Sequence, residues 1–191
     1  MNKELYYRII SSVILFPITI FLIIKGSIFF NFLLLITLLI SFFEWHSLSK
    51  KKSYNLFGFI FLLISFYSVY KLRIDSDNSF WTLLIITLIC ILTDLGGYIF
   101  GKLLKGPKLT KYSPNKTYSG LFGGYLMSLI LIPFLVLSDL SSSQEITKFF
   151  IFILLVSTIS QFGDITISFF KRISKIKDTG KIIPGHGGLL D

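Results

Sequence analysis

Residues 80–100 read FWTLLIITLICILTDLGGYIF, an apolar stretch interrupted by Asp94 and by the Gly96-Gly97 pair. A helix that crosses a membrane needs roughly 17–25 residues, and this stretch reaches that length unaided. Further apolar blocks flank it on both sides and predict helices over 9–25, 27–44, 55–71, 120–138 and 149–170. The sequence therefore predicts an all-α, polytopic integral membrane protein with about six transmembrane helices.

The composition supports a membrane protein over a soluble or disordered one. The chain has 191 residues, of which 53% are hydrophobic and 15% charged, and its mean hydropathy is +0.76. This much apolar mass excludes an intrinsically disordered chain. The one cysteine, Cys90, excludes a disulfide framework and a cysteine-based zinc site. We interpret residues 1–191 as a single membrane domain.

The first apolar block has an alternative interpretation as a signal peptide, because it follows a basic start. Pro17 interrupts this block, however, and no small-residue cleavage site follows it. A retained helix is therefore the interpretation that we prefer.

The basic residues predict the orientation of the helices. With the N-terminus in the cytoplasm and six crossings, fifteen of the 19 basic residues lie on the inner side and four on the outer side. Such a bias in short loops is typical of cytoplasmic segments. Residues 101–120 then form a cytoplasmic basic loop, residues 171–191 form a cytoplasmic tail, and both termini are cytoplasmic. The net charge of +9 is explained by topology and anionic lipid headgroups, so it does not indicate nucleic-acid binding.

Two acidic residues interrupt the apolar blocks at matching depth. Asp94 lies seven residues before Gly101, and Asp164 lies seven residues before Lys171, which places both carboxylates roughly 10 Å below the cytoplasmic helix ends. An intramembrane carboxylate costs about 2.5 kcal/mol or more, so it usually has a functional role. The alternative is that both acids snorkel or pair with neighbouring lysines. The adjacent glycines allow either close helix packing or close approach of backbone to a phosphate or metal.

Two polar segments follow these acids, GKLLKGPKLTKYSPNKTYSGLFGG at 101–124 and KRISKIKDTGKIIPGHGGLLD at 171–191. Lysines and arginine can neutralise phosphates, glycine turns can present backbone N–H groups, and paired carboxylates suit Mg²⁺. A polyphosphate–metal site is therefore plausible, although basic loops alone are common on membrane proteins. Neither a P-loop nor a GxGxxG pattern occurs. For His186 alone, a turn-capping role is as plausible as a catalytic one.

Residues 168–191, SFFKRISKIKDTGKIIPGHGGLLD, resemble the signature of the phosphatidate cytidylyltransferase (CDP-diacylglycerol synthase) family. The matching positions are Ser168, Lys171-Arg172, Lys177-Asp178, His186-Gly187-Gly188 and Asp191. Upstream, the segments 94–98, 113–117 and 163–164 are similar to further family elements, as is Glu44-Trp45. The family usually has an acid at the position of Ser119 and Glu at that of Ile167. Its signature continues past Asp191, so we expect a chain that is C-terminally truncated relative to the family.

The resemblance implies transfer of CMP from CTP to phosphatidate, giving CDP-diacylglycerol and pyrophosphate for phospholipid biosynthesis. It implies Mg²⁺ as cofactor, with a second cation as an option. The metal ligands implied are Asp164, Asp178 and Asp94. The catalytic residues implied are Asp164, Asp178, Lys171, Arg172 and His186. The substrate-binding residues implied are Ser113, Lys116, Thr117, Lys177, Gly187 and Gly188.

Two other functions stay open on the sequence. A CTP-dependent polyprenol or phytol kinase would release CDP instead of pyrophosphate, and a small ion-coupled carrier would use Asp94 and Asp164 for coupling. The expected partners are CTP, phosphatidate and membrane lipids, without nucleic acid, and a homodimer is an option because small intramembrane helices often pair. The expected location is a bacterial inner (cytoplasmic) membrane, as a multi-pass protein.

Overall fold

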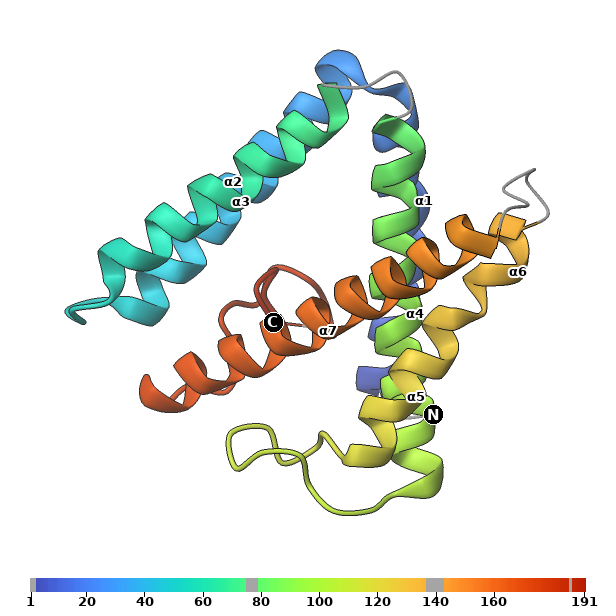
Figure 1. Cartoon of the computed structure of the whole chain (residues 1–191). Coiled ribbons are helices and arrows are strands. Elements are labelled where there is room, and N and C mark those ends of the chain that lie inside the picture. Colours follow the sequence, from blue (N-terminus) through green and yellow to red (C-terminus); the bar gives the residue numbers. More distant parts are fainter. Residues whose placement is uncertain (1–2, 75–78, 137–142, 186) are drawn as a thin grey trace. The chain divides into compact units, whose positions relative to one another are not determined.

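The computed structural model describes residues 3–74, 79–136, 143–185 and 187–191, and its regular elements are helices (Figure 1). These helices are α1 (Lys3–Lys25), α2 (Ser27–Ser49), α3 (Asn55–Ile74), α4 (Ser79–Leu104), α5 (Tyr118–Leu129), α6 (Leu131–Val136) and α7 (Ser143–Ile173). Two isolated β-bridges, Lys108–Thr117 and Ile183–Gly187, close loops between or after them. The all-α prediction is confirmed.

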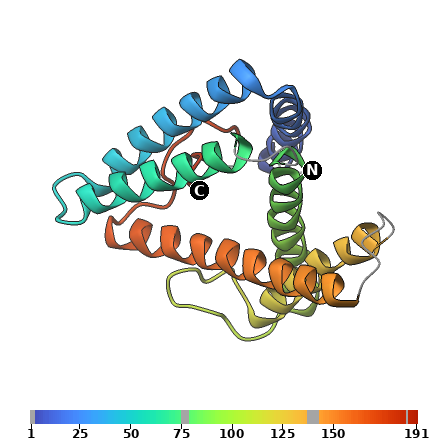
Figure 2. The same cartoon turned by 45° about the horizontal axis from the view of Figure 1, so that its top comes forward.

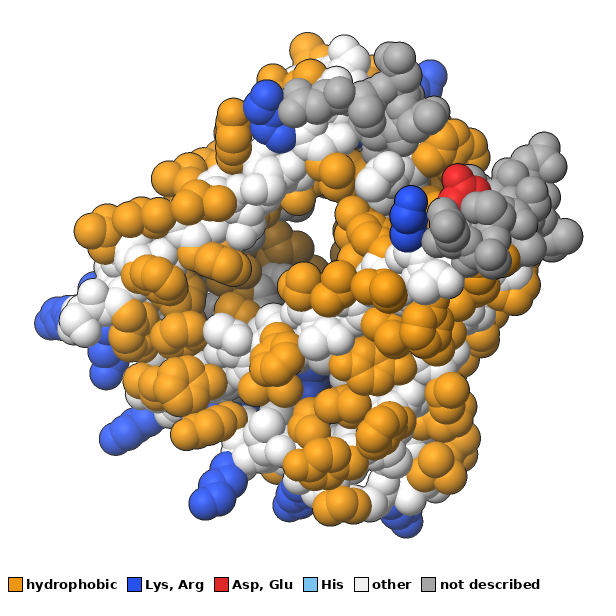
Figure 3. All heavy atoms as spheres, in the orientation of Figure 1, with side chains coloured by type: hydrophobic (Ala, Val, Ile, Leu, Met, Phe, Trp, Pro, Cys, Tyr) orange, Lys and Arg blue, Asp and Glu red, His pale blue; other side chains and the backbone are white. Residues whose placement is uncertain are grey.

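Among the described residues, four helices are long and apolar enough to cross a membrane, over Ser27–Ser49, Asn55–Ile74, Phe80–Leu104 and Glu145–Ile173. Two shorter apolar helical segments cover Ile10–Lys25 and Tyr118–Phe134. Large apolar side chains such as Phe57 on α3 and Phe162 on α7 are exposed, and hydrophobic side chains dominate the visible helix surfaces in Figure 3. In water this exposure would be costly, so the chain is a multi-pass membrane protein. The cytoplasmic placement of both termini stays a prediction.

The segment expected as one helix over 120–138 is divided in the structure. Helix α5 ends at Leu129, and the backbone N–H of Ile130 bonds to the carbonyls of Met127 and Ser128. Helix α6 then starts at Leu131 and has Pro133 in its first turn, where a missing backbone N–H costs little. Residues 137 and 138 lie outside the described residues.

The chain forms two compact units, one of residues 1–84 with 170–191, the other of residues 85–169. The expectation of a single membrane domain over 1–191 stays a prediction, and each unit is described by itself. In the first unit, α2 and α3 lie side by side (Figures 1 and 2). One apolar cluster there is centred on Ile23, Phe30 and Leu83.

A second cluster in the first unit is centred on Trp45, Leu48 and Leu62, with Phe170 packed against it. The Trp45 indole stacks edge-on to the Phe170 ring at 5.1 Å and donates its Nε1–H to the Asn55 carbonyl at 2.9 Å. A β-carbon on Gly58 would lie 1.8 Å from Trp45 Cε2, so the missing side chain of Gly58 makes room for this indole. The cluster therefore fixes the α2–α3 hairpin near the tail.

In the second unit, α4 and α5 cross on glycines. A β-carbon on Gly96 would lie 2.3 Å from the Gly123 carbonyl oxygen, and one on Gly120 would lie 2.7 Å from the Gly97 carbonyl oxygen. Helix α7 joins this crossing through polar bonds, because Thr93 Oγ1 donates to Ser157 Oγ at 2.9 Å. The backbones of α4 and α5 therefore lie in direct contact near the C-terminal end of α4, close to Asp94.

We predict that Gly96→Ala destabilises the second unit, because its methyl group would meet a backbone carbonyl that cannot move away. Overpacking of this kind costs about 1–3 kcal/mol, which a lower midpoint of thermal unfolding in mild detergent would report. Gly163→Ala is the matched control, since a β-carbon on Gly163 meets nothing within 4 Å, and a helical Gly→Ala change is neutral or stabilising. Equal midpoints for the two variants would contradict the close crossing.

Candidate functional site

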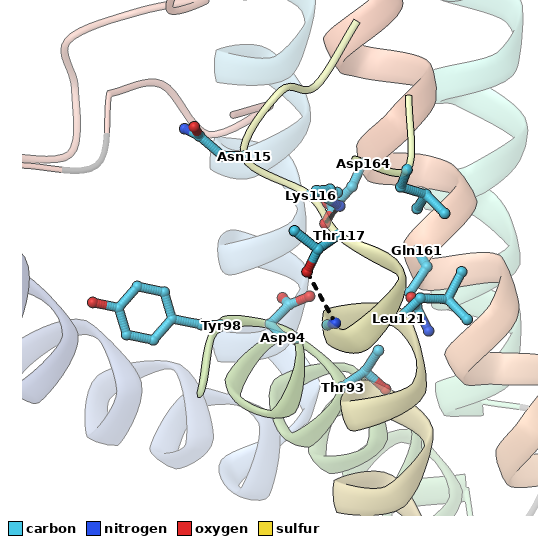
Figure 4. A pocket seen from close by; sticks show the side chains of 12 residues that line it. Thr93, Asp94, Tyr98, Asn115, Lys116, Thr117, Leu121, Gln161 and Asp164 are labelled. Carbon is cyan, nitrogen blue, oxygen red and sulfur yellow. Dashed lines mark hydrogen bonds and ion pairs between the residues drawn. The ribbon is translucent and has the colours of Figure 1, made fainter. Parts of the chain in front are cut away.

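The second unit contains a cavity of about 250 Å³ lined by polar side chains from three elements (Figure 4). Helix α4, the α4–α5 loop with the start of α5, and α7 all contribute. The polar lining residues are Thr93, Asp94, Tyr98, Asn115, Lys116, Thr117, Gln161 and Asp164. Pockets for drug-sized ligands measure roughly 300–1,000 Å³, so this cavity suits part of a substrate, such as phosphate groups.

The loop before α5 holds its cavity residues by backbone pairing. The N–H of Leu109 donates to the Lys116 carbonyl at 2.8 Å, and the N–H of Lys116 donates to the Ser113 carbonyl at 3.1 Å. Pro107 and Pro114 limit the backbone freedom of the same loop. This pairing holds Lys116 and Thr117 at the N-terminal end of α5.

Thr117 is the N-cap of α5, and its hydroxyl accepts a hydrogen bond from the N–H of Gly120 at 3.2 Å (Figure 4). The N-terminus of a helix carries partial positive charge and free N–H groups, which favour anions. A phosphate in this cavity would therefore meet both the start of α5 and the neighbouring ammonium of Lys116.

Lys116 forms an ion pair with Asp164 of α7 inside the cavity. The two side chains are 31% and 42% exposed, and pairs this exposed contribute about 0–1 kcal/mol. A phosphate or a cation can therefore replace either partner at little cost. Asp94 projects into the same cavity from α4 (Figure 4), which leaves the site with two carboxylates for one ammonium.

The donor set of this cavity fits a magnesium ion. Mg²⁺ is usually held by one or two carboxylates, with phosphates and water completing the shell, and Asp94 and Asp164 supply two carboxylates beside the hydroxyl of Thr117. Among the described residues, no group of three or more His, Cys, Asp or Glu side chains is arranged to hold a metal. Two carboxylates would leave positions in the shell of such an ion for phosphate oxygens and water.

The structure brings four of the predicted site residues together in this cavity: Asp94, Lys116, Thr117 and Asp164. Ser113 shapes the neighbouring turn, since its N–H donates to Thr110 Oγ1 at 3.1 Å. The predicted residues of the tail belong to the first unit: Lys171, Arg172, Lys177, Asp178, Gly187 and Gly188. His186 lies outside the described residues, and the predicted sharing of a metal by Asp164 and Asp178 stays a prediction.

The tail folds around the carboxylate of Asp191, whose side chain is 7% exposed. This carboxylate accepts hydrogen bonds from the N–H groups of Gly188 at 2.7 Å and Thr179 at 2.9 Å, and it pairs with Lys171 Nζ at 2.9 Å. Burial alone would raise the pKa of Asp191, but the Gly188, Lys171 and Thr179 donors outweigh it and hold that pKa below its ordinary value.

The tail turn itself depends on Gly187, which has φ of +110°, a backbone conformation that favours glycine. Gly187 and Ile183 exchange both backbone hydrogen bonds, at 2.8 and 2.9 Å. Asp178 lies beside this turn, because a β-carbon on Gly187 would lie 3.5 Å from Asp178 Cβ. Arg172, Lys177 and Asp178 are all exposed.

Several residues at these sites were not assigned from the sequence. Asn115 and Gln161 line the cavity, and their signals were a polar position inside the Ser-Pro-Asn-Lys-Thr loop and an amide inside an apolar helix. Glu44 of α2 binds the tail through Thr179. Its signal was a carboxylate near the end of an apolar helix, where burial costs free energy unless the carboxylate accepts hydrogen bonds.

Comparisons with known proteins place the chain among cytidylyltransferases. Residues 54–191 match the model of a family described as the Cytidylyltransferase family. The chain is 32% identical to phosphatidate cytidylyltransferase from Rickettsia conorii over 197 residues, covering 100% of this chain and 85% of that protein. It is 35% identical to the protein of the same name from Rickettsia typhi over 200 residues, covering 100% and 86%. A third relative, from Staphylococcus epidermidis, is 45% identical over 105 residues, covering 54% and 40%.

We predict that Asp191→Asn loosens the tail at neutral pH, because it removes the ion pair and the charge on two amide hydrogen bonds. Hydrogen bonds to charged groups contribute about 1.5–3 kcal/mol, so amide exchange at Thr179 and Gly188 should be faster by the corresponding factor. Protection of these amides in the unaltered chain should persist above the ordinary Asp pKa of about 3.9 and fall as the pH drops through the lower folded value. The Asn variant should lack this pH dependence, and equal protection in both chains would contradict it.

Proposed function

The chain belongs to the cytidylyltransferase family, and from that premise we propose that it transfers CMP from CTP to phosphatidate, giving CDP-diacylglycerol and pyrophosphate for phospholipid synthesis. The observation that carries this proposal is the match of the whole chain to relatives named phosphatidate cytidylyltransferase. The cavity that combines Lys116, Asp94 and Asp164 supports it, because its chemistry suits phosphates.

The reaction needs little from a general base. The attacking group is a phosphate oxygen of phosphatidate, which is already anionic at neutral pH. It forms a bond to the α-phosphorus of CTP while the bond between that phosphorus and the bridging oxygen to the β-phosphate breaks, and pyrophosphate leaves with the electron pair. The protein must bring two polyanions together and stabilise charge during in-line displacement.

The cavity residues supply parts of that task. Lys116 binds and neutralises a phosphate once its weak pair with Asp164 opens, and the start of α5 at Thr117 orients it through backbone N–H groups. The family resemblance adds Arg172 and Lys177 of the tail as expected phosphate-binding residues, and both are exposed in the first unit. Asp94 and Asp164 would hold Mg²⁺, and a bound Mg²⁺ would neutralise phosphate charge and orient the reacting oxygens.

The membrane placement suits a lipid substrate. The basic loop 101–120 and the tail 171–191 face the cytoplasm of a bacterial inner membrane in this proposal, so that CTP reaches the site from the cytosol. Asp94 and Asp164 lie within apolar helices, at the depth where a lipid headgroup meets that solution while its acyl chains stay in the bilayer. The homodimer stays a prediction.

Position-specific labelling of CTP tests the function directly. We expect membranes that contain the chain to transfer ³²P from α-labelled CTP into a phosphatidate-derived lipid, while γ-labelled CTP yields labelled pyrophosphate. A lipid kinase would instead move the γ-label into lipid, and a carrier would move neither. Either of those results would overturn the proposal.

We predict that Asp164→Asn lowers kcat/KM for CTP by at least about 100-fold, the scale on which loss of one electrostatic stabiliser acts. The neutral amide would also weaken the dependence of the rate on Mg²⁺ concentration. Thr166→Val is the matched control, because its hydroxyl is exposed two positions along α7 and bonds to its own helix at the Phe162 carbonyl. Normal turnover with unchanged Mg²⁺ dependence in Asp164→Asn would rule out the metal assignment.

A further inference from the structure

The carboxylate of Glu44 is buried in α2, with the residue 1% exposed, and three groups of the tail donate hydrogen bonds to it. Its Oε2 accepts from the Thr179 hydroxyl at 2.9 Å and from the N–H of Leu190 at 2.8 Å. Its Oε1 accepts from the N–H of Leu189 at 2.8 Å. Both oxygens are thus engaged by a segment more than 130 positions away in the sequence.

The tail backbone lies directly against this carboxylate. A β-carbon on Gly188 would lie 2.6 Å from both carboxylate oxygens, and one on Gly180 would lie 2.8 Å from Oε1. The absence of side chains at these two positions is what permits the contact. Two glycines of the tail therefore enclose the Glu44 carboxylate closely.

Glu44 and Asp191 hold the same residue from two sides. The hydroxyl of Thr179 donates to Glu44 and its N–H donates to Asp191. Asp178 precedes Thr179 in the chain, and Gly187-Gly188 precede Leu189. A β-carbon on Gly187 would lie 3.5 Å from Asp178 Cβ. The segments around Asp178 and Gly187 therefore lie close together, next to the tail residues Thr179 and Leu189 that bind Glu44.

Because Glu44 is buried, it cannot contact a substrate directly. The neighbouring cluster of Trp45 and Leu48 is apolar, so packing of that cluster does not explain why a carboxylate stands at this position. A buried carboxylate is expensive in an apolar helix, and here its hydrogen bonds go to the tail. The hydrogen bonds from the tail offset the free-energy cost of burying this carboxylate only while the tail is folded against α2. Glu44 therefore favours the folded tail over the unfolded tail.

We propose that Glu44 is a positioning residue that holds the tail 171–191 in its CTP-binding conformation, an inference that rests on the proposed function. If the competent tail is populated only in part, the apparent affinity for CTP falls by that fraction, whereas saturating CTP restores the bound conformation. The role therefore affects KM for CTP and leaves kcat unchanged.

Glu44→Gln in the full chain tests this role, because it keeps the side-chain shape and places an amide N–H against a tail donor. With phosphatidate in detergent micelles, we expect KM for CTP to rise about 10- to 100-fold, the effect of losing charge-assisted hydrogen bonds, with kcat and KM for phosphatidate unchanged. Thr179→Val removes one of the three bonds and should raise KM less. The double variant should be non-additive because the two changes remove the same bond.

Trypsin cleavage at the exposed lysines of the tail, Lys175, Lys177 and Lys181, gives a readout that does not depend on activity. It should be faster in Glu44→Gln without CTP and return to the unaltered rate at saturating CTP. Ser41→Ala is the matched control, since Ser41 is 2% exposed in α2 and its hydroxyl bonds to its own helix at the Thr37 carbonyl. This variant should behave like the unaltered chain in both assays.

A fall in kcat at unchanged KM for CTP, or unchanged tail cleavage, in Glu44→Gln overturns the positioning role. If the unaltered chain makes no lipid product from CTP, the proposed function fails instead. The cleavage rates without CTP then still decide whether Glu44 holds the tail.

Discussion

The close crossing of α4 and α5 is the constraint on which the cavity depends. Gly96 and Gly120 let one helix backbone lie against the other, and this contact brings the Asp94 end of α4 to the N-terminus of α5. With larger residues at the crossing, the carboxylate of Asp94 and the cap residue Thr117 could not line one cavity of about 250 Å³. In a membrane, where apolar burial does not drive helix association, small residues at the contact are what make such an approach stable.

Much of this arrangement was predictable because membrane helices and buried charges leave strong signals. Long apolar blocks predict helices whatever their tertiary contacts, and Asp94 and Asp164 stand out because carboxylates are rare within such helices. Their joint presence in one cavity followed from equal depth alone. The Ser-Pro-Asn-Lys-Thr loop resembles a family element, and this resemblance predicts Lys116 and Thr117 as site residues.

Other features depend on contacts between distant segments, which the composition and the spacing of residues do not predict. The pairing of Glu44 with Thr179 joins positions 135 apart, and no local pattern in α2 specifies its partner. The predicted helix 120–138 divides at Ile130; Pro133 follows and cannot bond to the carbonyl four residues before it, but transmembrane helices also tolerate proline, so the break could not be predicted. Asn115 and Gln161 are polar positions whose sequence signals do not specify a partner, and the fold places both beside the carboxylates of the cavity.

Two ion pairs among the described residues differ in how exposed their side chains are. Lys116 and Asp164 are 31% and 42% exposed, whereas Lys171 and Asp191 are 12% and 7% exposed. An exposed pair costs little to break, while removing one partner of a buried pair leaves an uncompensated charge. The Lys116–Asp164 pair is therefore the one that a competing anion or cation opens at the lower cost. Lys171, which matches a position of the family signature, pairs with Asp191 at 2.9 Å, and this pair supports the folded tail.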